Sequence, residues 1–162
     1  MALIKLHLDE FEEVDYELIA IHSTLEDYRM AFFINQKLPI MLSKCKEEII
    51  VKAKNDEVLF SKFVFDDSSN DLTWTLIQNK NEIITKEKTK NQTLFLNSEL
   101  AIETKVYLLP ELKKVDYFLK IENYRSDKEV EETIKELLAI ERISTAYKVD
   151  VNNIKSKNNL IF

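Results

Sequence analysis

The chain contains no glycine, although average usage of about 7% would give roughly eleven glycines in a chain of 162 residues. Loops that cradle phosphate groups need glycine, because their backbone approaches the phosphate closely and adopts positive φ. The strained nucleophile elbow of hydrolases has a similar need. The absence of glycine therefore excludes a P-loop, a Rossmann fingerprint and a nucleophile elbow. Turns must use Asn and Asp instead, and the candidates are Asn55-Asp56, residues 68–71 and residues 79–81.

Cysteine and histidine are almost as scarce, with Cys45 the only cysteine and His7 and His22 the only histidines. A single cysteine permits no internal disulfide, which fits a reducing compartment. The ligand spacings of zinc and calcium sites do not occur, so we expect no metal site and no cofactor. Nucleophilic catalysis could use only His22, Ser23 and Cys45, and the sequence offers no further group that would orient the histidine. We therefore expect no catalytic residue and favour a protein that is not an enzyme.

Apolar runs are short, and none reaches the roughly eighteen residues that a membrane-spanning helix needs. The N-terminal residues lack the pattern of a secretory signal. A net charge of −6 and a pI near 5.1 argue against a general nucleic-acid-binding protein. We expect a soluble cytoplasmic protein that associates with neither membranes nor nucleic acid. The 45% hydrophobic content suffices for one core, so residues 1–162 should form a single domain.

One short phrase occurs twice, as Val14-Asp15-Tyr16 and as Val115-Asp116-Tyr117. Each copy opens a stretch with the composition of a strand, and each is followed by the pattern of a capping box, at residues 23–26 and 126–129. In a capping box a serine oxygen accepts from an orphan backbone N–H and a glutamate reaches back to the start of the helix. The repeat predicts one strand–helix unit written twice, over residues 14–38 and 115–143.

Periodicity gives the remaining elements. Residues 14–22 alternate as a strand, and the face carrying Val14, Tyr16, Leu18 and Ala20 is the better core candidate. Pro39 ends a helix predicted over residues 24–38. Further strands are expected over residues 58–65, 72–77, 82–88, 93–96, 104–109, 115–122 and 145–149, with a second helix over 127–143. A polar tail closes the chain, and its last residues, 160–162, could dock on the body.

Two strand–helix units with extra strands predict an α+β fold. We expect an antiparallel-rich mixed sheet with both helices on one face and a ferredoxin-like core, in which the two repeated strands lie side by side and parallel. Residues 58–109 would form a β-meander inserted into that core, and residues 145–162 a C-terminal strand and tail. Parallel neighbours would place Asp15 and Asp116 at equivalent strand ends.

Residues 109–117 resemble the signature of the IPExxxVDY family, a group of bacterial proteins of about this length. Five residues match the motif at its spacing, and Leu109 replaces its isoleucine conservatively; the five are Pro110, Glu111, Val115, Asp116 and Tyr117. The similar length implies that the resemblance extends over the whole chain. It implies no activity, cofactor or catalytic residue.

The motif has two interpretations. In the structural one, Pro110 ends a strand and Glu111 and Asp116 stabilise the following turn through backbone N–H groups or nearby lysines. In the functional one, these two carboxylates join Asp15 in a cluster that binds a divalent cation or performs acid–base chemistry. The structural interpretation is favoured, because no nucleophile or electrophile accompanies the carboxylates.

Tyr16 and Tyr117 also have two interpretations. Paired aromatic rings on neighbouring strands could stack a planar ligand or an unpaired base. Each tyrosine lies on the same strand face as apolar residues. This position favours buried tyrosines whose hydroxyl groups find hydrogen-bond partners at the rim of the core.

The leading functional hypothesis is a non-enzymatic interaction module or accessory subunit, with a protein partner or a homodimer formed through a sheet face that the two helices leave uncovered. The alternative is a small-ligand-binding protein or an enzyme, with a pocket that contains at least two of Asp15, Glu111 and Asp116. A third possibility is an RNA-associated accessory factor, which would use Lys80, Lys86, Lys88, Lys90, Lys155 and Lys157.

Overall fold

The computed structural model describes residues 14–53, 55–87 and 100–162. It is an α+β fold in which two α-helices accompany ten strands, and three short 3-10 helices lie in the second half of the described chain. The elements are β1 (Tyr16–Ser23), α1 (Asp27–Lys37), β2 (Ser43–Lys44), β3 (Ile49–Ala53), β4 (Asp56–Phe60), β5 (Lys62–Asp67), β6 (Leu72–Gln78), β7 (Lys80–Glu87), β8 (Leu100–Tyr107), η2 (Pro110–Leu112), β9 (Tyr117–Glu122), α2 (Asp127–Leu138), β10 (Ile143–Lys148), η3 (Val151–Asn153) and η4 (Lys157–Leu160).

Six strands form the main sheet, in the order β10-β1-β9-β6-β5-β2, and every neighbouring pair is antiparallel. The repeated strands β1 and β9 are adjacent, as the repeat predicts. They run in opposite directions, however, with Tyr16 opposite Glu122 and Ile21 opposite Tyr117. The expected mixed sheet and the parallel central pair of a ferredoxin-like core are therefore wrong. The same register places Asp15 and Asp116 at opposite ends of the strand pair.

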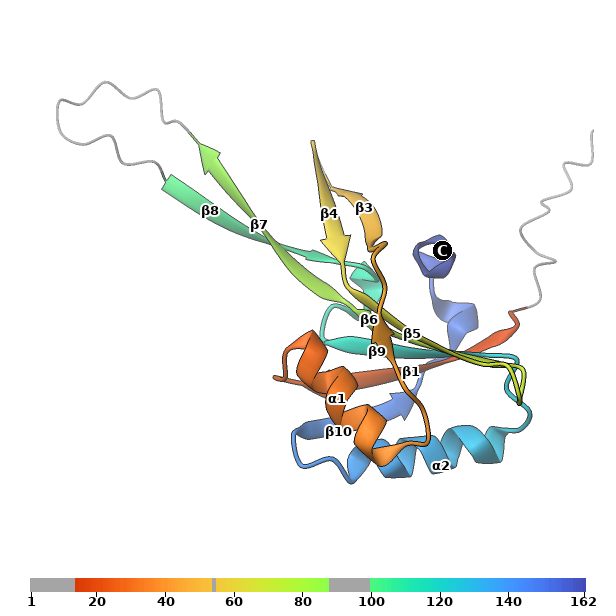
Figure 1. Cartoon of the computed structure of the whole chain (residues 1–162). Helices are drawn as coiled ribbons and strands as arrows, with labels where there is room; N and C mark the ends of the chain where they lie inside the picture. Colours follow the sequence, from red (N-terminus) through yellow and green to blue (C-terminus); the bar gives the residue numbers. More distant parts are fainter. Residues whose placement is uncertain (1–13, 54, 88–99) are drawn as a thin grey trace, which may run out of the picture.

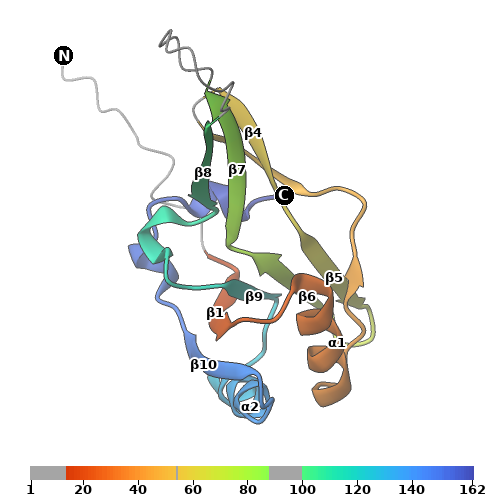
Figure 2. The same cartoon turned by 90° about the vertical axis from the view of Figure 1, so that its left-hand side faces the viewer.

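Both helices cover one face of the main sheet (Figures 1 and 2). Alternate residues of β1 and β9, among them Ile19 and Leu119, point into this layer. They meet Met30 and Ile34 of α1 and Leu137 of α2, all fully buried. The prediction that two helices share one face is confirmed.

The opposite face of the sheet is also buried. Leu18, Ala20 and Phe118 point into a second core, which is closed by the hairpins β3–β4 and β7–β8 and by the C-terminal segment. All four central residues of β1, from Leu18 to Ile21, are therefore buried, because each face of the strand has its own core. The expectation of a single buried face, with the other left open for a partner, is wrong.

Residues 58–109 do not form one continuous meander. Ser61 interrupts an otherwise continuous strand, so that β5 belongs to the main sheet and β4 to the two-stranded sheet with β3. Asn79 separates β6 from β7 in the same way. The predicted strand over residues 93–96 lies outside the described residues. The predicted turn over residues 68–71 is confirmed, and Asp71 adopts a φ of 56° there without glycine.

The two predicted capping boxes differ. Ser126 is the N-cap residue of α2, as predicted, but its side chain makes no capping hydrogen bond, and Glu129 accepts from the N–H of Arg125 instead. The second box is therefore right only in the position of its N-cap residue. The first box is wrong, because Glu26 occupies the N-cap position of α1. The hydroxyl of Ser23 instead donates to the carbonyl of Arg142, at 2.7 Å, and joins β1 to the segment before β10.

Candidate functional site

The motif residues 109–117 form a structural junction around one buried side chain, that of Asn79. Its side-chain amide donates to the carbonyl oxygens of Leu112, at 3.0 Å, and Val115, at 2.8 Å. Its side-chain oxygen accepts from the N–H of Leu109, at 2.9 Å. The segment between β8 and β9 turns, so its backbone groups lack partners in a neighbouring strand. The side chain of Asn79 supplies hydrogen-bond partners to three of these groups. The sequence predicted a turn over residues 79–81, and that prediction is wrong, because β7 begins at Lys80.

Glu111, in η2, anchors the C-terminal segment to this junction. Its carboxylate accepts from the backbone N–H of Ser156, at 2.8 Å, and from the hydroxyl of Ser156, at 3.0 Å. Partial burial alone would raise the pKa of Glu111, but the hydrogen bonds from Ser156 outweigh it and lower the pKa below its ordinary value. Glu111 therefore stabilises the fold in its charged form.

The lowered pKa of Glu111 predicts a pH dependence. Because the folded-state pKa lies below the ordinary value of 4.5, the stabilisation is complete above that pH and is lost as pH falls through the folded-state pKa. We expect the stability difference between wild type and Glu111→Gln to be constant from neutral pH to about pH 5. It should then shrink at lower pH, as measured by urea unfolding. Glu57→Gln, at an exposed position of β4, is the control; a difference that grows on acidification would contradict this role.

Asp116 makes its own set of contacts at the other side of the motif. One carboxylate oxygen lies 2.8 Å from the ammonium group of Lys80, and the other accepts from the N–H of Ser23, at 2.9 Å. Asp116 therefore ties β7 and the end of β1 to the start of β9. Lys80 is consequently paired rather than available for RNA. Of the other lysines proposed for RNA, Lys155 is exposed and Lys157 is half-buried, while Lys88, Lys90 and the side chain of Lys86 lie outside the described part of the chain.

The two motif tyrosines lie on opposite faces of the main sheet. Tyr117 is buried in the helix-side core, and its hydroxyl donates to the carbonyl of Leu25, at 2.6 Å. Burial raises the pKa of this hydroxyl, with the nearby carboxylates adding to the shift. Tyr16 is half-buried on the other side, with its ring 4.8 Å from the ammonium group of Lys120. The pair cannot stack one ligand, and Tyr117 has the buried role that the sequence favoured.

The three motif carboxylates do not converge. Glu111 binds Ser156, Asp116 binds Lys80 and Ser23, and Asp15 lies at the far end of β1. Within the described ranges, no group of three or more histidine, cysteine or acidic residues is arranged to hold a metal ion. His22 contacts the hydroxyl of Tyr147, at 3.1 Å, and Cys45 is half-buried.

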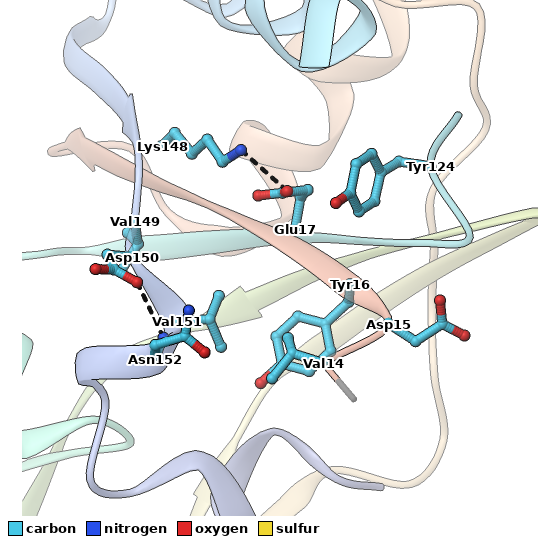
Figure 3. Close-up of a pocket in the computed structure, with 10 residues that line it drawn as sticks. All are labelled: Val14, Asp15, Tyr16, Glu17, Tyr124, Lys148, Val149, Asp150, Val151 and Asn152. Atoms are coloured by element: carbon cyan, nitrogen blue, oxygen red, sulfur yellow. Dashed lines mark hydrogen bonds and ion pairs between the residues drawn. The ribbon is translucent and has the colours of Figure 1, made fainter. Parts of the chain in front are cut away.

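A pocket of about 700 Å³ lies at the Asp15 end of β1. Ten residues from the start of β1, the turn after β9, the end of β10 and η3 line it: Val14, Asp15, Tyr16, Glu17, Tyr124, Lys148, Val149, Asp150, Val151 and Asn152. Figure 3 shows the ammonium group of Lys148 and the hydroxyl of Tyr124 pointing toward the carboxylate of Glu17. Of the three carboxylates Asp15, Glu111 and Asp116, only Asp15 lines this pocket.

Glu17 is the central group of the pocket, and its side chain is only 9% exposed. Its carboxylate lies 3.0 Å from Lys148, which also contacts Asp127, at 3.1 Å. Hydrogen bonds to these two carboxylates raise the pKa of Lys148, and a hydrogen bond to Glu17 raises the pKa of Tyr124. Three carboxylates against one lysine make the lining acidic, so the pocket suits a cationic group better than an anion. Because Glu17 and Lys148 are paired with each other, the pocket favours the binding of a ligand over acid–base catalysis.

A second candidate surface is the outer side of α1. This helix buries Met30, Ala31 and Ile34 against the sheet, yet Tyr28 is 59% exposed and Phe32 is 56% exposed one turn further along. Aromatic side chains at i and i+4 share one stripe of a helix surface. The outer side of α2 is mostly charged in contrast. The apolar residues of α1 therefore extend from its buried side to its exposed outer side.

No family model, curated protein or solved structure matches the chain. Membership of the IPExxxVDY family therefore stays a prediction. Among the described residues, no helix is both long enough and apolar enough to cross a membrane.

Proposed function

We propose that the protein is a non-enzymatic interaction module that binds another protein through the outer face of α1. The exposed pair Tyr28 and Phe32 carries the proposal. Burying large aromatic side chains dominates the energetics of many interfaces, and two exposed aromatic rings on one helix face leave that contribution available to a partner. Arg29 lies beside them, and tyrosine and arginine are enriched at the residues that contribute most to binding.

The spacing of these residues favours one kind of partner. Side chains at i and i+4 of a helix anchor it in an apolar groove, which is the mode used by many helical ligands. The matching surface is a hydrophobic groove on a different protein, bordered by a carboxylate that pairs with Arg29. The protein would still be an accessory subunit, but its binding surface would be the helix α1 and not a face of the sheet.

The test is native mass spectrometry of the protein isolated at moderate salt from the cells that make it. Wild type and Leu138→Lys, which alters an exposed apolar residue on α2, should retain the same stoichiometric protein partner. The double variant Tyr28→Lys/Phe32→Lys should lose that partner by at least about tenfold, because both anchors are replaced by charges. Retention by the double variant, or absence of a partner from wild type, would contradict the proposal.

The pocket beside Glu17 supports a second candidate, a small-ligand-binding protein. Its volume falls within the roughly 300–1,000 Å³ of small-molecule sites, and an ion pair between the buried Glu17 and the exposed Lys148 lies in its wall. In the same native spectra this function would appear as a small added mass on the chain, without a protein partner.

A further inference from the structure

Within the described part of the chain, strand β8 is an edge of its sheet. It pairs with β7 in an unbroken register from Leu100 to Tyr107, and among the described strands β7 is its only neighbour. The N–H of Leu108 donates to the carbonyl of Asn79, at 2.9 Å. In an antiparallel pair, every second residue directs its N–H and C=O toward the partner strand, so this bond shows which residues of β8 face β7. By alternation, the backbone groups of Ala101, Glu103 and Lys105 point away from β7. Figure 1 shows the β7–β8 hairpin projecting from the body of the protein.

Proteins block exposed edges with proline, with bulges, with short strands or with charged side chains. Of these protections, β8 has only charged side chains, at Glu103 and Lys105. Residues 100–107 contain no proline, the register has no bulge, and the strand is 8 residues long. Among the described residues, none hydrogen-bonds the outward backbone groups of Ala101, Glu103 or Lys105. Ile102 remains 45% exposed on the face that β8 shares with the half-buried Val106.

The charges along the edge are self-complementary. When two copies of β8 run antiparallel with Thr104 on the two-fold axis, Glu103 of one copy lies opposite Lys105 of the other, and Lys105 lies opposite Glu103. Ile102 then lies opposite Val106 of the other copy. A shift to the next register in either direction, with the same hydrogen-bond phase, would place Glu103 opposite Glu103 or Lys105 opposite Lys105. Opposite charges directly across a strand pair are favourable and like charges are unfavourable, so the edge selects the register centred on Thr104.

We propose that two copies of the chain pair through β8 and form a four-stranded antiparallel sheet, β7-β8-β8-β7. The occupant of the open edge is thus a second copy, and the outward N–H and C=O groups of each β8 satisfy those of the other. This pairing rests on the proposed function, because a dimer presents two α1 faces to partners. Its contacts use no residue of α1, so the two proposals can fail separately.

Charge reversal tests the pairing on the complete chain, with analytical ultracentrifugation as the readout. Glu103→Lys places lysine opposite lysine in the dimer, and Lys105→Glu places glutamate opposite glutamate. Each variant alone should dimerise at least about tenfold more weakly than wild type, because both symmetry-related pairs become repulsive. Dimerisation should return in the double variant Glu103→Lys/Lys105→Glu and in an equimolar mixture of the two single variants. A monomeric wild type at about 100 μM, or a mixture that stays monomeric, would overturn the proposal.

A backbone variant provides a second test. Lys105→Pro removes an N–H that points away from β7, so the β7–β8 pair can tolerate it while the pairing of two copies loses a hydrogen bond on each side. We expect an unchanged circular dichroism spectrum and loss of the dimer. Tyr28→Lys/Phe32→Lys should dimerise like wild type, which separates failure of this pairing from failure of the α1 proposal. A Lys105→Pro variant that dimerises like wild type would also overturn the proposal.

Discussion

Replacing Asn79 with alanine is expected to lower the free energy of unfolding by about 3–5 kcal/mol, although the change removes only an amide group. The Asn79 side chain pairs with the carbonyl oxygens of Leu112 and Val115 and with the N–H of Leu109. Because Asn79 is fully buried, water cannot easily replace these partners. Each backbone group left unpaired in the core costs about 1–3 kcal/mol.

Urea unfolding monitored by circular dichroism measures this effect. Asn158→Ala, at an exposed position of η4, is the control and should change stability by less than about 0.5 kcal/mol. Asn79→Asp keeps the size and the acceptor but loses the two donated hydrogen bonds, so it should be about as damaging as alanine. A loss below about 1 kcal/mol for Asn79→Ala would show that the motif segment can rearrange or admit water.

Replacing Phe118 with alanine is expected to cost about 3–5 kcal/mol. Phe118 lies on the central strand β9, next to Tyr117, and its fully buried ring fills the core between the main sheet and the second layer. The change leaves a cavity in a region where the sheet, two hairpins and the C-terminal segment meet, and elements that are fixed on several sides collapse poorly into a void.

Phe32→Ala is the matched control, because it removes the same ring from an exposed position of α1. It should change stability by less than about 1 kcal/mol, since its ring leaves little new cavity. Both variants are compared with wild type by thermal and urea unfolding. Similar losses for the two variants would contradict the assignment of Phe118 to a core and would also show that the α1 face is structural.

The sequence predicted the central strands of the sheet but not their direction. The repeated Val-Asp-Tyr phrase correctly indicated two similar strands, and β1 and β9 are neighbours. The apolar alternation of a strand is the same in either direction, so the pattern cannot separate parallel from antiparallel pairing. Direction depends on the path of the chain between and after the two strands, and here β6 flanks β9 and β10 flanks β1.

The candidate surfaces were also only partly predictable. Asn79 follows Gln78 and precedes Lys80 in a polar stretch, which is the composition of a turn, and only the fold reveals that the motif segment covers it. Glu17 and Lys148 are far apart in the sequence, and no local signal links them. For α1, the sequence showed the apolar residues, but the share that the sheet buries depends on the angle at which the helix packs.

The long-range pairing of β1 has a consequence for synthesis on the ribosome. Its partner β9 follows after about one hundred residues, and Tyr147 of its other neighbour β10 is separated from His22 by 125 positions. At roughly 5–20 residues per second, β1 waits several seconds for either partner. During that interval the run from Leu18 to Ile21 has neither of the strands nor the cores that later bury it. Nascent chains of this protein should therefore depend on chaperones that hold apolar segments, and slower elongation between β1 and β9 should lengthen that dependence.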